Sequence, residues 1–226
     1  MTQLKKCKKI VLDIETTGLP NKVRIDYKNC KNENKYKLKF IHPAFFEKYD
    51  NCRIIEIAYV LLDEDDQIIK SCSSLIKGNS IKNSDIHGIT EQMCQEQGVL
   101  MMDFFNEFET DLKSVQVFVA HNAEFDFTVL LSECYRYNRS DIIYMLKKIK
   151  IYCTMHNGSR VLKSTKFLKL IELYKHYFKD DETQTHRALD DVIMCYKSYL
   201  KIKDNLPVFI FMDYVETVET VETEKN

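Results

Sequence analysis

The chain has 226 residues, of which 45% are hydrophobic and 30% charged, and its net charge at neutral pH is −1. This composition is ordinary for a globular domain and excludes a uniformly basic nucleic-acid-binding protein. No apolar run approaches the ~20 residues needed to cross a bilayer, and the apolar run after Lys9 is broken at Asp13, so we expect no secretion signal. We therefore expect an intracellular protein of the cytoplasm or nucleus, not a secreted one, with no membrane partner.

The eight cysteines are spread along the chain, and none of them forms a Cys-x-x-Cys pair. Disulfide frameworks and zinc sites usually show closer and more regular spacing. We expect reduced thiols that mostly fill the core, and no zinc site.

The first half of the chain predicts three strands, at residues 8–15, 52–63 and 68–77. Residues 20–51 lack a clear apolar period and are rich in Lys, Asn and Tyr, so we interpret them as a long insertion. Within it, residues 21–40 carry seven Lys or Arg side chains against two acids. The acidic turn at 63–67 joins the second and third strands closely, which predicts an antiparallel meander.

In the second half the apolar period becomes helical. Helices are predicted at 89–98, 99–113, 123–137, 164–178 and 187–201, and strands at 115–120 and 148–154. In the last helix, the apolar side chains predict a buried stripe that excludes both Asp190 and Asp191; the stripe consists of Leu189, Val192, Ile193, Tyr196 and Leu200. The order of three strands, helix, strand, helix, strand and helices is typical of a mixed α/β layer fold.

The C-terminal segment differs from the rest of the chain. Residues 206–215 are mostly apolar, and a Val-Glu-Thr repeat follows them. Residues 213–226 have a net charge of −4, which leaves +3 for the remainder. We expect the repeat to be disordered or a frayed helix. Two interpretations remain open: a solvated tail, or a docking peptide anchored by Phe209 and Phe211.

Two acids lie in the first predicted strand. Successive side chains of a strand alternate between faces, so Asp13 and Glu15 share one face, about 7 Å apart at the backbone. One interpretation is that this face is exposed at a sheet edge. The other is a site for hard divalent cations, which prefer oxygen ligands.

Two later segments combine histidine, asparagine and acids. The sequence HNAEFD at 121–126 follows a predicted strand and opens a helix, and sites gather at strand ends in α/β folds. Asn122 could instead cap that helix, and Asp126 could favour its dipole. The sequence THRALDDV at 185–192 opens the last helix with His186 ahead of two acids, where a structural role is the simpler alternative.

Together the three segments resemble a known family. Asp-x-Glu-Thr-Thr-Gly at 13–18, His-Asn-Ala-x-Phe-Asp at 121–126 and His-x-Ala-x-x-Asp at 186–191 occur in the order found in the DEDDh, or DnaQ-like, 3′–5′ exonucleases. That family includes the proofreading subunit of bacterial replicative DNA polymerase, oligoribonuclease, RNase T and the TREX exonucleases. The resemblance covers roughly residues 8–203. It implies a ribonuclease H-like α/β fold, with a five-stranded mixed sheet flanked by helices.

The resemblance also implies roles for individual residues. The metal-binding acids would be Asp13, Glu15, Asp126 and Asp191, and the histidine-to-aspartate spacing selects Asp191 over Asp190. His186 would be the general base, since histidine ordinarily titrates near neutral pH. The segment DIHGIT at 85–90 also looks like part of the family pattern. The residues implied to lie against the terminal nucleotide are Thr16, Thr17, His87, Ile89, Asn122 and Phe125.

The chemistry implied is hydrolysis by two divalent cations, Mg²⁺ with Mn²⁺ as a substitute, held between the four acids. The enzyme would remove 5′-mononucleotides from a single-stranded or frayed 3′ end, with DNA as the favoured substrate. The alternatives are trimming of RNA 3′ ends and a non-catalytic scaffold that associates with a polymerase, which would be expected to have lost an acid. Residues 1–204 would form the exonuclease domain, and residues 205–226 a tail that is a candidate binding site for a DNA polymerase or another replication protein.

The sequence departs from the family pattern in three places. Cys153-Thr154 stands where relatives often have Asp-Thr, the insertion at 20–51 is longer than in compact relatives, and the C-terminal tail has no counterpart. Basic side chains could hold the phosphates of a strand or could simply be solvated. They are Lys22, Arg24, Lys28, Lys35, Lys37, Lys39, Arg160, Lys163, Lys166 and Lys169.

Overall fold

The computed structural model describes residues 7–26, 36–81, 84–179, 183–205 and 207–216. In these residues, a six-stranded sheet has the spatial order β5-β4-β1-β6-β7-β8, and β2 and β3 form a separate two-stranded sheet. The strands of the large sheet are β1 (Lys9–Thr16), β4 (Ile54–Leu62), β5 (Ile68–Leu75), β6 (Val117–Ala120), β7 (Lys150–Cys153) and β8 (Phe209–Ile210). The predicted mixed α/β sheet is confirmed, but the count of five strands was one short, because β8 has only two residues.

Strand β1 occupies the middle of the sheet. It pairs antiparallel with β4 and parallel with β6, and β5 continues the antiparallel side beyond β4. The predicted meander of the first three strands is therefore confirmed. On the other side, β7 runs parallel to β6, and β8 pairs antiparallel with β7.

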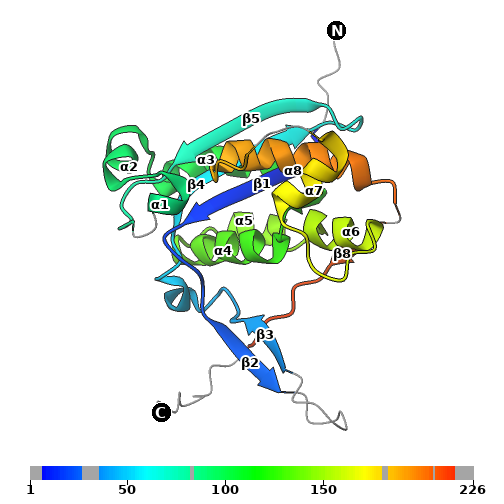
Figure 1. The fold of residues 1–226 in the computed structure, drawn as a ribbon. Helices are drawn as coiled ribbons and strands as arrows, with labels where there is room; N and C mark the ends of the chain where they lie inside the picture. Colours follow the sequence, from blue (N-terminus) through cyan, green and yellow to red (C-terminus); the bar gives the residue numbers. More distant parts are fainter. Residues whose placement is uncertain (1–6, 27–35, 82–83, 180–182, 206, 217–226) are drawn as a thin grey trace.

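Helices cover both faces of the sheet (Figure 1). On one face, α3, α4 and α5 pack against Ile10, Leu12 and Ile14 of β1. On the other, α7 and α8 pack against Val11. The helices are α1 (Ser84–His87), α2 (Glu91–Gln97), α3 (Met101–Leu112), α4 (Ala123–Arg136), α5 (Ser140–Leu146), α6 (Thr154–Val161), α7 (Leu170–Phe178) and α8 (Ala188–Ile202), with a 3-10 helix, η1, at Phe46–Tyr49. In the described part of the chain, no helix has the length and apolar character needed to span a membrane.

No strand was predicted within residues 20–51, which was wrong for the described part of this segment, whereas its interpretation as an insertion stays a prediction. Strands β2 (Lys22–Asp26) and β3 (Tyr36–Phe40) pair antiparallel, and the hairpin projects away from the central sheet (Figure 1). In β3, Lys37 and Lys39 alternate with apolar residues, which is the period of a half-buried strand, so the strand signal was present in the sequence but was missed. Two of the basic residues considered as phosphate ligands, Lys28 and Lys35, lie outside the described residues.

The C-terminal segment crosses from the sheet to this hairpin. Phe209 of β8 packs edge-on against Tyr152, with ring centroids 6.2 Å apart. Further on, Asp213 forms an ion pair with Lys39 at 2.6 Å, and Val215 bridges to the residue after β3. Phe211, between them, is 92% exposed. Most of the acidic repeat, from residue 217 onward, lies outside the described residues.

Three helix predictions need correction. The described chain has three helices, α1, α5 and α6, that were not predicted; α6 has the sequence TMHNGSRV, which contains few apolar residues. Helix α7 begins at Leu170 rather than near residue 164, because the backbone N–H of Lys169 donates to the Glu172 carboxylate at 2.9 Å. In α8 the buried face is rotated from the predicted stripe, and it includes Asp191, which is 4% exposed.

Candidate active site

Strand β1 places two acids on the face of the sheet that α8 covers. Asp13 and Glu15 alternate with Ile14, which packs into the core on the opposite face. Asp13 lies opposite Ala58 of β4, and Glu15 lies opposite Glu56. The sheet therefore brings three carboxylates close together before any helix contributes another, an arrangement that needs cations nearby.

The chain leaves β1 through a tightly held loop. The hydroxyl of Thr16 donates to the carbonyl of Gly18 at 2.8 Å. The hydroxyl of Thr17 accepts the backbone N–H of Arg53 at 3.0 Å and donates to the carbonyl of Asn51 at 3.3 Å. A Cβ atom at Gly18 would lie 2.7 Å from that same carbonyl oxygen, so only glycine fits there. These contacts fix the end of β1 and hence the direction of Glu15.

Helix α4 contributes Asp126 from its first turn. Its carboxylate accepts the backbone N–H groups of Asp126 itself and of Ile14, and it is 2% exposed. Asn122 stands at the helix N-cap with φ +65°, and its side chain makes no capping hydrogen bond, which contradicts the alternative that it caps the helix. The left-handed backbone at Asn122 turns the chain sharply from β6 into α4.

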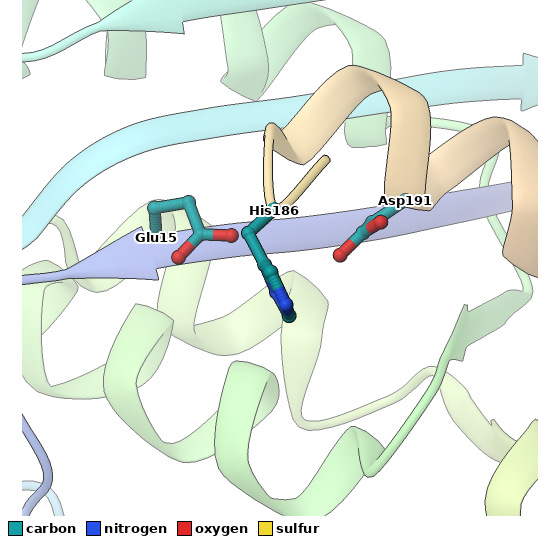
Figure 2. Close-up of side chains that lie close together, drawn as sticks. All are labelled: Glu15, His186 and Asp191. Atoms are coloured by element: carbon teal, nitrogen blue, oxygen red, sulfur yellow. The ribbon is translucent and has the colours of Figure 1, made fainter. Parts of the chain in front are cut away.

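The segment before α8 contributes His186, and α8 itself contributes Asp191. His186 is exposed and has φ +53°, a backbone conformation that is uncommon outside glycine and often marks functional sites. Gln184 Nε2 donates to Oδ2 of Asp191 at 2.6 Å, whereas Oδ1 is buried without a partner among the described residues. Figure 2 shows the imidazole of His186 between the carboxylates of Glu15 and Asp191. One ligand atom from each of the three lies within 4.8 Å of the other two.

Asp190 is directed away from this cluster. It is exposed, and its Oδ2 accepts the hydroxyl of Thr185 at 2.7 Å. Of the two adjacent acids at the start of α8, the structure therefore brings Asp191 to the other carboxylates, which is the acid that the motif spacing selected.

A residue that the sequence did not single out anchors the start of α8. Glu56 of β4 is 1% exposed, and its carboxylate accepts Nη2 of Arg187 at 2.6 Å, Nε of Arg187 at 3.1 Å and the backbone N–H of Ala188 at 3.0 Å. Paired bonds from a guanidinium are strong and directional. They fix the helix start that carries His186 and Asp191. The sequence feature that could have identified Glu56 is its position as an acid inside the apolar run of residues 54–62.

Replacing Glu56 with Gln should lower both stability and turnover. The amide removes the charge that three N–H groups share, and a hydrogen bond to a charged group contributes about 1.5–3 kcal/mol. For a loss of that size we expect the thermal midpoint to fall by about 4 °C in saturating Mg²⁺, since 1 kcal/mol corresponds to about 2–4 °C at this chain length. Glu47→Gln, at an exposed acid of η1, is the matched control. A variant with wild-type midpoint and wild-type turnover would contradict the anchoring role.

The four motif acids have raised pKa values. For Asp13, burial is the main cause, and the charges of Asp126, Asp191 and Glu15 add to it. Burial and the charge of Asp191 raise the pKa of Glu15 to about 8. Burial likewise raises the pKa values of Asp126 and Asp191. Only positive charge brought among these acids allows them to ionise together.

The donor set fits divalent cations. Hard cations such as Mg²⁺ and Mn²⁺ bind carboxylate oxygens, and Oδ1 of Asp191 is a buried oxygen that still lacks a partner. Arg187 lowers the pKa of Glu15, and Gln184 and His186 lower that of Asp191, but burial outweighs these contacts and both pKa values remain raised. Residues Asp13, Glu15, Asp126 and Asp191 would hold the ions.

The residues expected to contact a terminal nucleotide differ in accessibility. His87 is 3% exposed; its Nδ1 accepts the N–H of Ile89, and its Nε2 is buried without a partner among the described residues. Burial lowers the pKa of His87, and the charges of Glu56 and Arg187 also act on it, which places the ring beside the site. Ile89 is fully buried with Ile55 and Leu75. The other four are the half-buried Phe125, the exposed Asn122, and Thr16 and Thr17, whose hydroxyls bond within the loop.

Comparisons with known proteins give one family match and several structural matches. A model of the exonuclease family RNase_T matches residues 10–199. No curated protein sequence matches the chain. Pop2p of S. pombe, in its Mg²⁺- and Mn²⁺-bound form, has 15% identity and a TM-score of 0.61 over 88% of this chain and 84% of its own.

Two other structures bind nucleic acid. E. coli exonuclease I in complex with a dA16 oligonucleotide has 15% identity and a TM-score of 0.58, and the match covers 88% of this chain but 41% of that chain. A 3′-exonuclease that recognises the 3′ end of a histone mRNA stem-loop has 12% identity and a TM-score of 0.59, over 94% of this chain and 73% of its own. At such identities the likeness shows the fold, and it confirms the predicted ribonuclease H-like class.

Proposed function

The chain belongs to the exonuclease family, as a member of its DEDDh type, and we propose that it removes 5′-mononucleotides from the 3′ end of single-stranded or frayed DNA. The observation that carries the proposal is the convergence of Asp13, Glu15, Asp126 and Asp191 with His186 at the end of β1. A scaffold that had given up catalysis would not need to maintain four mutually repelling acids, each of which destabilises the metal-free fold.

We assign the cofactor as two Mg²⁺ ions, for which Mn²⁺ can substitute. Bound between the four carboxylates, two such ions would lower the pKa of an attacking water and stabilise the leaving 3′ oxygen. The fit rests on the all-oxygen set of acids and on the unpartnered Oδ1 of Asp191. Mg²⁺ and Mn²⁺ are the ions named for the bound form of Pop2p.

The protein's own groups supply positioning and proton transfer. His186, beside Glu15 and Asp191, would accept the proton of the attacking water on an imidazole nitrogen as the water attacks the last phosphodiester. Gln184 holds one oxygen of Asp191, and the other, which has no partner among the described residues, would be available to bind an ion. Glu56 and Arg187 fix the backbone from which His186 projects. The bond broken joins phosphorus to the 3′ oxygen of the penultimate nucleotide, so the product is a 5′-mononucleotide.

The second candidate is an exoribonuclease that trims RNA. The observation in its favour is the likeness to the 3′-exonuclease of the histone mRNA stem-loop, which covers more of this chain than exonuclease I does. Nothing in the described site selects against a 2′-hydroxyl. We favour DNA because exonuclease I binds dA16 with the same fold.

Matched DNA and RNA oligomers of one sequence, labelled at the 5′ end, distinguish the two functions. With Mg²⁺ we expect a ladder of shortened DNA, formed at least about tenfold faster than the RNA ladder, which corresponds to about 1.4 kcal/mol of discrimination at the sugar. Faster RNA shortening would overturn the DNA assignment and leave the exoribonuclease. A partner polymerase that binds through the C-terminal tail is part of the same proposal, and Phe211→Ala, at a side chain that is 92% exposed, should then weaken its binding but not hydrolysis.

A further inference from the structure

An aromatic pair lies on the surface beside the second motif. The ring of His156, in α6, stacks on Phe167 with centroids 4.7 Å apart and planes inclined by 15°. Phe167 is 62% exposed, so this stack does not belong to either hydrophobic core. The stacking on His156 orients the ring of Phe167, and most of the side chain remains exposed to solvent. The ring therefore has one flat face that is accessible to a ligand.

The loop that carries Phe167 is held rigidly. The backbone N–H of Leu168 donates to the hydroxyl of Ser159 at 3.0 Å. The hydroxyl of Ser164 donates to the carbonyl of Lys166 at 2.7 Å, and Lys166 forms an ion pair with Glu172 at 2.8 Å. The exposure of Phe167 is therefore a fixed property of the loop, because contacts on both sides hold the backbone.

A half-buried histidine, His121, links this loop to the catalytic end of the sheet. His121 Nε2 donates to the carbonyl of Leu168 at 3.0 Å, and its Nδ1 lies 3.0 Å from the hydroxyl of Thr154, the first residue of α6. Burial lowers the pKa of His121 to about 4, so the ring is neutral and keeps one N–H to donate. His121 directly precedes Asn122, from which α4 leads to Asp126. The aromatic pair is thus fixed to the motif that contributes a metal-binding acid.

The projecting hairpin brings a positive charge to the same region. Lys37 of β3 is exposed. Burial is the main cause of the lowered pKa of His156; the charge of Glu124, in the first turn of α4, raises this pKa, and the charge of Lys37 lowers it. The ion pair between Lys39 and Asp213 joins the hairpin to the C-terminal segment. An aromatic face with a neighbouring lysine is the combination that proteins use to bind single strands, by stacking on bases and attracting phosphates.

We propose that Phe167, stacked on His156, and Lys37 of the hairpin bind the nucleotides that precede the 3′-terminal nucleotide of a single-stranded substrate. A base stacks on the free face of Phe167, and a phosphate of the same strand lies near Lys37. The inference rests on the proposed exonuclease function, and it assigns to the hairpin the role of holding the strand. Stacking on a phenylalanine is tolerant of sequence, so the site adds affinity without base preference.

Two substrates separate this site from the catalytic centre. The p-nitrophenyl ester of thymidine 5′-monophosphate has no upstream nucleotides, whereas a 15-nucleotide oligothymidylate has them. For Phe167→Ala we expect KM for the oligomer to rise about tenfold, in line with the effect of losing one stacked base, with no change in kcat or KM for the ester. Phe167→Trp should restore the low KM, and Tyr144→Ala, at an exposed aromatic of α5, is the control.

The salt dependence tests Lys37 separately. For Lys37→Ala, the slope of log KM for the oligomer against log salt should decrease by about 0.7, the value for one phosphate contact on a single strand. An unchanged KM for the oligomer in Phe167→Ala would overturn this inference but not the proposed function. An equal loss of activity on both substrates would have the same consequence, because it would indicate a structural role for the loop. A wild type that hydrolyses neither substrate would overturn the proposed function and this inference with it.

Discussion

Asp13→Asn should reduce turnover by at least about 1,000-fold. The substitution keeps the size of the side chain and removes one charged oxygen ligand from the centre of the site. Metal ions contribute several kcal/mol to charge stabilisation in the transition state, and about 4 kcal/mol corresponds to about 1,000-fold in rate. Asp190→Asn is the matched control, because that neighbouring acid is exposed and bonded to Thr185 rather than to the cluster. Its turnover should stay close to that of the wild type.

The same substitution should stabilise the metal-free protein at alkaline pH. Burial and neighbouring acids raise the pKa of Asp13, and they raise that of Glu15 from 4.5 to about 8. When the pKa of an acid is higher in the folded state than in the unfolded state, the acid does not affect stability at a pH below the unfolded-state pKa. As the pH rises from there through the folded-state pKa, the free energy of unfolding decreases. The wild type in chelator should therefore lose stability between about pH 4.5 and 8.

Thermal unfolding in chelator measures this effect. Asp13→Asn should unfold at a higher temperature than the wild type at pH 8, and the difference should shrink toward pH 4. Adding Mn²⁺ should raise the midpoint of the wild type but leave that of the variant nearly unchanged. A variant that is less stable than the wild type at pH 8, or that keeps its turnover, would show that Asp13 is not part of a metal-binding cluster.

His186→Asn should reduce turnover by about 100- to 10,000-fold, the usual contribution of a positioned general base. Asparagine is the substitution of choice because it tolerates the left-handed backbone, here φ +53°, and cannot accept the proton in the same way. The four acids remain, so stabilisation by Mn²⁺ and KM for an oligonucleotide should change little. The loss should fall on kcat.

The combination of a lower kcat with unchanged metal binding distinguishes this role from a structural one. Wild-type kcat in the variant, or a loss of Mn²⁺ stabilisation comparable to that of Asp13→Asn, would contradict the assignment as base. The second result would instead place His186 among the metal ligands.

The sequence predicted much of this architecture because the central elements have clear periods. Residues 12–15 of the first strand alternate apolar and acidic positions, and α4 follows β6 with its acid in the first turn. Residues 101–108 showed one apolar face, and the structure buries Met101, Phe104, Phe105 and Phe108 on it. The spacing of the third motif selected Asp191 over Asp190, and the structure places Asp191 beside Glu15.

Other features depend on contacts that no local pattern reveals. The two-residue strand β8 exists only because it pairs with β7, and the buried residues of α6 are small or polar, namely Thr154, Asn157, Gly158 and Ser159. The buried face of α8 was misplaced because Asp191 counts as polar in a period argument, yet the site buries it. Glu56 was not predicted as an anchoring residue, because its partner Arg187 is 131 residues away in the chain and no local pattern connects the two.

Analysis of the first product tests the central claim most directly. An oligonucleotide labelled in its 3′-terminal nucleotide is incubated with the wild type and with Asp13→Asn, with Mg²⁺ or with chelator, and the labelled products are separated. The account predicts that a labelled 5′-mononucleotide appears first, only with the wild type and only with the metal. Labelled internal fragments, release from the 5′ end, or an equal yield from Asp13→Asn would contradict a metal-dependent 3′–5′ exonuclease built on these carboxylates.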